Sequence, residues 1–230
     1  MSRNTVGVVL AAGKGTRFTD ETPKQFVRLG DKPVLAHSVD AMQACGVIDA
    51  IVIVTSADRV KQVRDMTKAF RWSKVTAVIP GGDQRFDSTR AALSVYDDTV
   101  FDNILLHDAA RPLLSQEVLH SIVAALDTDE AVTAAIPVTD TVVRADAQNA
   151  VLETPDRATL WQVQTPQGFD LYTIQEAYRR IDPADLPRFT DDTAVVRHVF
   201  PHISVKLVPG SRRLMKLTYP EDLALLSALL

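Results

Sequence analysis

The chain has 230 residues, of which 46% are hydrophobic and 23% charged, and its formal net charge is -4. This length and hydrophobic content suffice for one large folded domain and exclude an intrinsically disordered chain. The slightly acidic balance gives no reason to expect a nucleic-acid-binding protein. The sequence shows no charged-then-apolar leader and no apolar run of membrane-spanning length, so we expect a cytoplasmic protein with no membrane partner.

The first apolar run, at residues 6–10, predicts a buried parallel strand. Small residues and three cations follow it: Ala11, Ala12, Gly13, Lys14, Gly15, Arg17 and Lys24. Backbone without large side chains can approach a ligand closely, and consecutive amides suit phosphate oxygens. The segment is no Walker loop, because Gly15 follows Lys14, and no dinucleotide fingerprint, because Phe18 replaces the third glycine. It predicts a nucleotide phosphate site of another kind; the alternative is an ordinary turn with solvated lysines.

Strands and helices are then expected to alternate. In chain order, the pattern predicts a helix at 33–45, a strand at 51–54, a helix at 58–70, a strand at 75–79, a helix at 84–95, a strand at 103–107, a helix at 115–126 and a strand at 131–136. Ser115 is the predicted N-cap of the helix at 115–126. This alternation predicts an α/β fold of the Rossmann-like kind, with a mostly parallel sheet and helices on both faces. We expect residues 1–230 to form a single domain.

The alternation is interrupted after residue 136. Val142-Val143 and Val151-Leu152 predict the two strands of an antiparallel hairpin, so residues 137–160 are expected to project from the body as an arm. Trp161 and Phe169 are predicted to be buried nearby. The last predicted elements are a helix at 171–181, a strand at 204–208 and a helix opened by Pro220.

Polar residues follow several predicted strands, at the edge where parallel α/β sheets bind ligands. Gly81-Gly82 would allow a tight turn and a close backbone approach, or is simply a turn. Asp108 follows the strand at 103–107, and its carboxylate could meet a Mg²⁺ bound to phosphates. The alternative for Asp108 is an ion pair with Arg111 that fixes the loop. His107 is predicted to be a packed strand residue rather than a ligand or base.

Six segments carry a family resemblance: LAAGKGTRF, TPKQF, HDAARP, WQVQTPQGF, FTDDTAVV and KLTYPEDL. In this order they resemble the cytidylyltransferases that activate sugar-alcohol phosphates, in particular the 2-C-methyl-D-erythritol 4-phosphate cytidylyltransferase family of non-mevalonate isoprenoid synthesis. The resemblance covers nearly the whole chain. It implies that the protein transfers the cytidylyl group of CTP to methylerythritol phosphate, with Mg²⁺ as cofactor and pyrophosphate as the second product. It also implies a homodimer.

The resemblance implies roles for individual residues as well. The implied catalytic residues are Arg17, Lys24, Arg157 and Lys216. The implied nucleotide-binding residues are Ala11, Ala12, Gly13, Lys14, Gly15, Gly82, Asp83, Ser88, Asp108 and Ala109. The implied substrate-binding residues are Thr141, Arg157, Thr165, Thr190 and Lys216. Asp108 is the candidate Mg²⁺ ligand, and Thr141 and Arg157 lie on the arm, which would reach into the neighbouring subunit.

The implied chemistry agrees with the composition of these segments. The acceptor's phosphate oxygen is already anionic at neutral pH, so the reaction needs cations around the phosphates rather than a strong general base. Three other functions remain open. A ribitol-5-phosphate cytidylyltransferase would share most of these segments. A non-catalytic nucleotide-sensing module would not need the distant Lys216. A hexose 1-phosphate nucleotidyltransferase would need sugar-hydroxyl partners that the sequence does not identify.

Overall fold

The computed structural model describes residues 3–13, 18, 22–96 and 99–230. Its main sheet contains seven strands: β1 (Thr5–Ala11), β4 (Ala50–Thr55), β5 (Val75–Pro80), β6 (Asn103–Asp108), β7 (Ala131–Pro137), β10 (Trp161–Asp170) and β11 (Val205–Pro209). They lie in the order β11-β7-β10-β6-β1-β4-β5. β10 is antiparallel to β6 and β7, whereas the other neighbouring pairs are parallel. The predicted mostly parallel sheet is confirmed.

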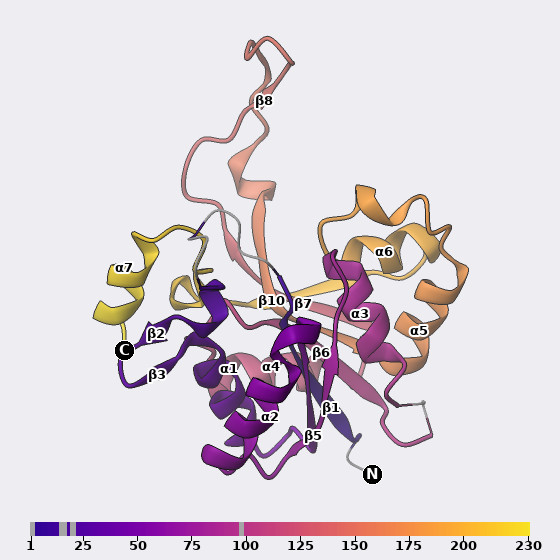
Figure 1. The fold of residues 1–230 in the computed structure, drawn as a ribbon. Helices are drawn as coiled ribbons and strands as arrows, with labels where there is room; N and C mark the ends of the chain where they lie inside the picture. The colour runs from indigo at the N-terminus through magenta and orange to yellow at the C-terminus, as the bar shows by residue number, and fades with distance from the viewer. Residues whose placement is uncertain (1–2, 14–17, 19–21, 97–98) are drawn as a thin grey trace.

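Helices cover both faces of this sheet, as predicted (Figure 1). They are α1 (Val34–Gln43), α2 (Val60–Ala69), α3 (Arg85–Leu93), α4 (Gln116–Ala125), α5 (Leu171–Arg180) and α6 (Asp192–Val199). One apolar cluster joins the sheet to α1, α2 and α4, and a second joins it to α3, α5 and α6. Helix α7 (Asp222–Ala228) lies in a third apolar cluster, where its Leu226 packs with Leu29 and Val34. Val9 belongs to the first cluster and Val8 to the second, because successive strand residues point to opposite faces.

Side-chain caps fix the helices that begin near the strand ends. Ser115 accepts a hydrogen bond from the Val118 N–H at the start of α4, which confirms the predicted cap. Gln84 and Asp87 cap α3 reciprocally. Asp191 accepts from the Ala194 N–H at the start of α6. These caps hold the first turns of the helices beside the carboxyl edge of the sheet.

β10 is absent from the sequence-based prediction, although it lies in the middle of the sheet. Proline cannot donate a hydrogen bond to a neighbouring strand, so a run that contains Pro166 is typical of a loop. The pairing of β10 with β7 shifts its register between Val163 and Gln167, which accommodates the proline. Phe169 is fully buried, as predicted, but the prediction for Trp161 is wrong, because that side chain is 45% exposed.

The arm, residues 137–160, projects from the body and contains the predicted hairpin (Figure 1). Its strands are β8 (Arg144–Ala145) and β9 (Val151–Glu153), so the first strand lies after Val142-Val143 rather than on them. The side chain of Asp146 accepts hydrogen bonds from the N–H groups of Gln148 and Ala150, both at 2.9 Å. This turn sets the pairing register, which sequence alternation alone does not.

Helix α7 begins at Asp222, so the prediction that Pro220 opens the last helix is wrong. The Asp222 carboxylate accepts hydrogen bonds from the N–H groups of Thr218 and Tyr219 and thereby holds the preceding residues in a turn. Shorter or less periodic elements were also not predicted: β2 (Arg28–Leu29), β3 (Lys32–Pro33) and α6. None of the helices in the described part of the chain is long and apolar enough to cross a membrane.

Candidate active site

The carboxyl ends of β1, β5 and β6 surround a first cavity of about 230 Å³. The lysines Lys24 and Lys216 line it. So do the described residues that were predicted to bind a nucleotide: Ala11, Ala12, Gly13, Gly82, Asp83, Ser88, Asp108 and Ala109. Lys14, Gly15 and Arg17 lie outside the described residues. The sheet brings these distant positions together because its parallel strands end at one edge.

Gly81 sets how closely the walls of the first cavity approach each other. A Cβ atom at Gly81 would lie 2.7 Å from the Cβ of Ala12 and would clash with the hydroxyl of Ser88. The glycine therefore lets the end of β5 and the first turns of α3 pack directly against the small-residue segment after β1. Ala12 and Ser88, the two residues closest to this position, both line the first cavity.

Gln25 fixes the described start of the small-residue segment. Its buried side-chain amide donates to the carbonyl oxygen of Ala11 at 2.7 Å and to that of Gly13 at 3.0 Å. Lys24 precedes it in the short 3-10 helix η1 (Lys24–Phe26), directly after Pro23. The same short element thus holds the backbone at Ala11 and Gly13 and places Lys24 in the cavity wall. Sequence reasoning missed Gln25, although it lies in the segment TPKQF.

A second cavity of about 190 Å³ adjoins the first. It lies between β10 and the start of α6, and its lining includes Gln164, Thr165, Gln167, Thr190 and Asp191. Arg85, Asp108 and Lys216 line both cavities. Among the predicted substrate-binding residues, Thr165, Thr190 and Lys216 therefore come together at the second cavity.

Thr141 and Arg157 are not brought into either cavity of their own chain. Both are exposed on the arm, and Arg157 donates to the carbonyl oxygen of Thr139 at 2.9 Å. Of the four predicted catalytic cations, Lys24 and Lys216 therefore line the cavities, Arg157 does not, and Arg17 lies outside the described residues.

Asp108 lies at the boundary of the two cavities, between two cations. Lys216 Nζ is 2.7 Å from its Oδ2 and Arg85 Nε is 3.5 Å from its Oδ1. Burial alone would raise the pKa of the Asp108 carboxyl, but Lys216 and Arg85 hold that pKa well below its usual range. The close ion pairs of Asp108 are thus with Lys216 and Arg85 and not with Arg111, the alternative considered above; the charge of Arg111 also lowers the pKa of Asp108, while its guanidinium donates to the carbonyl oxygen of Leu214 at 2.6 Å.

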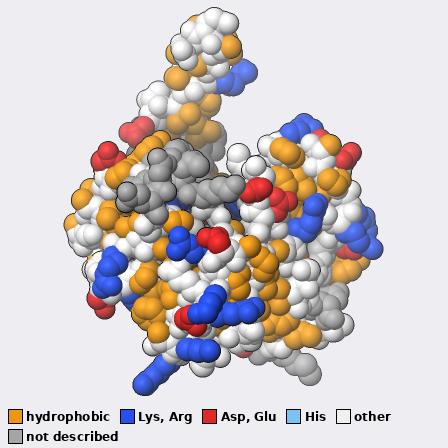
Figure 2. All heavy atoms as spheres, in the orientation of Figure 1, with side chains coloured by type: hydrophobic (Ala, Val, Ile, Leu, Met, Phe, Trp, Pro, Cys, Tyr) orange, Lys and Arg blue, Asp and Glu red, His pale blue; other side chains and the backbone are white. Residues whose placement is uncertain are grey.

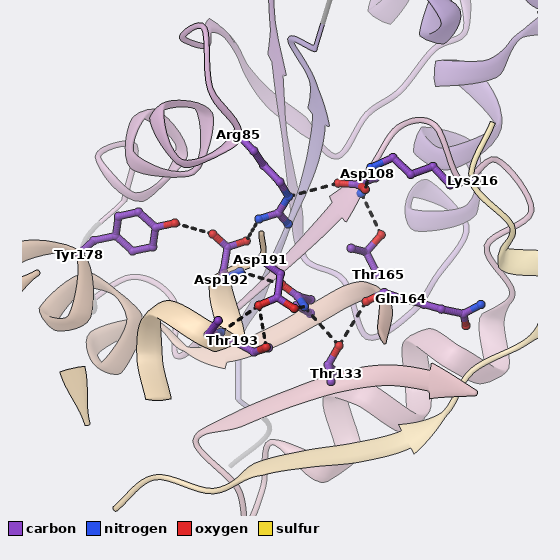
Figure 3. A network of polar contacts seen from close by, with 12 residues as sticks. Arg85, Asp108, Thr133, Gln164, Thr165, Tyr178, Asp191, Asp192, Thr193 and Lys216 are labelled. Carbon is purple, nitrogen blue, oxygen red and sulfur yellow. Dashed lines mark hydrogen bonds and ion pairs between the residues drawn. The ribbon is translucent and has the colours of Figure 1, made fainter. Parts of the chain in front are cut away.

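Arg85 connects this boundary to a buried network behind it (Figure 3). Its guanidinium also pairs with Asp192, a fully buried carboxylate at the start of α6. Tyr178 donates to Asp192 Oδ1 at 2.5 Å, and the Asp192 N–H donates to Gln167 Oε1 at 3.2 Å. Burial alone would lower the pKa of Arg85, but Asp192 and Asp108 raise it. Arg85 is thus a fixed cation, which sequence reasoning did not identify as a site residue.

His107 supports the site from within the sheet, as predicted for a packed strand residue. Burial lowers the pKa of His107 to about 4, so the ring is neutral at pH 7. Its Nε2 lies 3.0 Å from the carbonyl oxygen of Arg111 and must donate there, so Nδ1 accepts from the Thr165 hydroxyl at 3.1 Å. Thr165 in turn accepts from the Asp108 N–H at 3.0 Å. This chain fixes the backbone beneath Asp108 and leaves the imidazole no proton-transfer role.

The described residues contain no group of three or more His, Cys, Asp or Glu side chains that could hold a metal ion by themselves. Asp108 is ionised and lines the first cavity. A single carboxylate suits Mg²⁺, which is commonly held by one or two carboxylates together with substrate phosphates and water. The donor set therefore fits a metal that arrives with a nucleotide.

A mostly parallel sheet with a small-residue segment, a glycine turn and lysines around a strand-end cavity defines an α/β nucleotide-binding protein. The family model of IspD, 2-C-methyl-D-erythritol 4-phosphate cytidylyltransferase, matches residues 5–230. A protein of that name from Thermobifida fusca is 39% identical over 229 residues, which cover 96% of this chain and 91% of that one. The crystal structure of 4-diphosphocytidyl-2C-methyl-D-erythritolsynthase from Anaerococcus prevotii has a TM-score of 0.85 and 27% identity, and the match covers 99% of this chain and 96% of that chain.

The chain belongs to the IspD family. It is a cytidylyltransferase of isoprenoid synthesis that transfers the cytidylyl group of CTP to 2-C-methyl-D-erythritol 4-phosphate, so the predicted reaction is confirmed. The bifunctional ribulose 5-phosphate reductase/CDP-ribitol pyrophosphorylase Bcs1 of Haemophilus influenzae is 36% identical over 227 residues, which cover 97% of this chain and 48% of that protein. The chain is therefore also similar to a protein named as a CDP-ribitol pyrophosphorylase.

Proposed function

We propose that cytidylyl transfer takes place where the two cavities meet, at Arg85, Asp108 and Lys216. CTP occupies the first cavity. Its base and ribose lie beside Gly82 and Asp83, which follow β5, and Ser88 of α3, and its triphosphate lies on the small-residue segment. Methylerythritol phosphate occupies the second cavity, with its phosphate toward Lys216. The observation that supports this arrangement is that the same three residues line both cavities, so that groups held in each would face one another there.

The proposed chemistry is an in-line displacement at the α-phosphate. An anionic oxygen of the acceptor phosphate forms a bond to the α-phosphorus, and the bond from that phosphorus to the bridging oxygen breaks, with the electron pair leaving on pyrophosphate. Lys24 and Lys216 stabilise the negative charge that is shared among the phosphates during this step. Lys216 pairs with Asp108 and also lines the second cavity, so its ammonium is placed to interact with the acceptor phosphate there.

Asp108 is the proposed protein ligand of Mg²⁺, together with phosphate oxygens of the nucleotide. Its ion pairs keep the carboxylate deprotonated, which a metal ligand requires. The ion, when bound, would neutralise part of the triphosphate charge and polarise the phosphorus–oxygen bonds. The Asp108 backbone is held by Thr165, so the carboxylate is offered to the first cavity from a fixed position.

A second copy of the chain is the proposed partner of the arm. Figure 2 shows apolar side chains on the surface of the arm. Four large apolar side chains are exposed there: Val142, Val143, Val151 and Leu152. Exposed apolar groups gathered in this way are typical of an interaction surface. In a two-fold dimer each arm would bring Thr141 and Arg157 to the second cavity of its neighbour, which lacks them within its own chain.

Pyrophosphate release tests this arrangement. With CTP, we expect turnover with methylerythritol phosphate well above that with ribitol 5-phosphate, and none with glucose 1-phosphate. With methylerythritol phosphate as acceptor, CTP should be strongly preferred over ATP and GTP, because a narrow site that hydrogen-bonds one base leaves its polar groups unpaired with another. Equal turnover with ATP would contradict the nucleotide's placement, and a preference for ribitol 5-phosphate would contradict the acceptor's.

A further inference from the structure

Lys216 is carried by a loop rather than by a helix or strand. The loop begins at Gly210, directly after β11, passes through the short 3-10 helix η5 (Arg212–Leu214) and ends at Leu217. The Lys216 ammonium nevertheless lies at a defined place, 2.7 Å from Asp108 Oδ2 at the boundary of the two cavities. Because a loop has no repeating hydrogen-bond ladder of its own, this position depends on how the loop is attached to the body.

Gln164 of β10 attaches the start of the loop. Its buried side-chain amide donates from Nε2 to the carbonyl oxygen of Ser211 at 2.8 Å, and its Oε1 accepts from the Ser211 N–H at 3.1 Å. One side chain thus pairs with both backbone groups of Ser211, as a neighbouring strand would. The Ser211 hydroxyl in turn accepts from the Arg213 N–H at 3.1 Å and caps η5.

Gly210 allows this attachment. Its N–H donates to the carbonyl oxygen of Ala135 in β7 at 2.8 Å, which places it against the sheet. A Cβ atom at Gly210 would clash with Oε1 of Gln164 and would lie 3.1 Å from the same Ala135 oxygen. The amide of Gln164 therefore fits only because this position has no side chain.

Other residues attach the far end of the loop. The Leu217 N–H donates to the carbonyl oxygen of Ala110 at 2.8 Å, and Arg111 donates to that of Leu214 at 2.6 Å. Lys216 lies beyond η5, so its side chain depends on both attachments. The attachment through Gln164 comes from β10, which also lines the second cavity.

We propose that Gln164 is a positioning residue, whose amide holds the start of the 210–217 loop so that Lys216 reaches the boundary of the two cavities. The inference rests on the catalytic role proposed above for Lys216. A displacement of about 1 Å at a reacting centre can lower the rate by roughly 10². We expect Gln164→Met to lower kcat by about 10- to 100-fold, with a smaller change in KM for CTP, whose base and ribose contacts lie elsewhere.

A double-mutant cycle with Lys216→Ala separates positioning from a general loss of structure. Methionine preserves the length of the glutamine side chain but not its amide. If Gln164 acts through Lys216, Gln164→Met lowers kcat in the wild-type background and has little further effect in the Lys216→Ala background. The matched control is Gln175→Met, because the amide of Gln175 also makes two hydrogen bonds to the backbone, donating to the carbonyl oxygens of Leu93 and Tyr96 at 2.9 and 2.8 Å, and lines neither cavity. It should lower the free energy of unfolding and leave kcat unchanged.

Gly210→Ala provides a second route to the same displacement of Lys216, because its methyl group pushes the Gln164 amide away although no side chain that lines a cavity is replaced. Gly210→Ala should lower kcat as Gln164→Met does. It also allows the proposal to be tested if Gln164→Met does not fold. Unchanged kcat in a folded Gln164→Met enzyme, or an equal loss in both backgrounds of the cycle, would overturn the positioning role. If Lys216→Ala itself leaves kcat unchanged, the role proposed for Lys216 fails, and this inference fails with it.

Discussion

Two arginine–carboxylate pairs, one in the sheet body and one in the arm, differ in how far solvent reaches them. In the body, Arg85 meets Asp192, and their side chains are 27% and 0% exposed. In the arm, Arg144 meets Glu153 at 3.0 Å, and their side chains are 67% and 52% exposed. An ion pair of the same kind, guanidinium with carboxylate, is therefore part of a buried network in the body and of a solvent-exposed hairpin in the arm.

The difference shows how the two regions take part in the site. The body fixes its own charged groups: Asp108, Arg85 and Asp192 are linked, and Thr165 and His107 hold the backbone beneath them. The arm satisfies its turn locally and leaves its apolar side chains exposed. The charged groups of the body are thus held within one chain, whereas the apolar side chains of the arm stay exposed and are the surface proposed above to contact a second copy.

The largest expected effect comes from removing the buried carboxylate. Asp192→Ala leaves the Arg85 guanidinium partly unpaired in a buried place, so the free energy of unfolding should fall by about 3–5 kcal/mol. The matched change in the arm, Glu153→Ala, should cost less than about 1 kcal/mol, because solvent screens an exposed pair. Urea denaturation of both variants measures the two costs. Equal losses of unfolding free energy in the two variants would mean that the buried pair is no more important for stability than the exposed one.

Lys24→Ala is expected to lower kcat by roughly 10²–10³, the usual cost of one group that stabilises charge in the transition state. Pro23 restricts the backbone before Lys24, and Lys24 lines the first cavity. CTP affinity should change much less, and Lys24→Arg should restore activity only in part, since a planar fork presents its charge differently. Single-turnover kinetics and calorimetric CTP titration measure the two effects separately.

The control for Lys24 is Lys61→Ala, which removes an exposed lysine from α2, outside both cavities. It should leave kcat and CTP affinity unchanged. A loss confined to CTP affinity in Lys24→Ala, with the chemical step intact, would make Lys24 a binding residue rather than a catalytic one.

His107 should make the body sensitive to acid. Its pKa in the folded protein is about 4, below the ordinary value of 6.5, so between these values the unfolded chain binds a proton that the folded protein does not. The free energy of unfolding should therefore fall as the pH drops from 6.5 towards 4, by about 3 kcal/mol from this group. His107→Asn should remove that part of the pH dependence, whereas His202→Asn, at an exposed position, should retain it. Parallel stability curves for wild type and His107→Asn would contradict the assignment.

The smallest expected effect is a partial recovery of activity through the arm. If Arg157 serves the neighbouring subunit, mixing Arg157→Ala with Lys24→Ala protomers gives hybrid dimers in which one of the two sites keeps both residues. With random exchange, the mixture should reach about a quarter of wild-type activity, although each parent is nearly inactive. Size-exclusion chromatography of each parent checks that both still form dimers. A mixture as inactive as its parents would mean that the arm does not complete a neighbour's site.

The sequence by itself determined the α/β class, the order of most elements and the family. These features are local: the periodicity of apolar residues reports which faces are buried, and small or charged residues at the strand ends indicate where a phosphate would bind. Even single residues follow from this reasoning, such as the cap at Ser115 and the packed His107.

Only the tertiary structure decided where β10 lies and which polar groups meet. β10 is a strand because β6 and β7 offer it hydrogen-bond partners on both sides, although its own composition favours a loop. Arg85 and Asp192 are 107 residues apart, and Gln164 and Ser211 are 47 apart, so no local pattern connects them. Such pairings depend on which strands become neighbours in the sheet, and that choice is made by the packing of the whole chain rather than by the preferences of any segment.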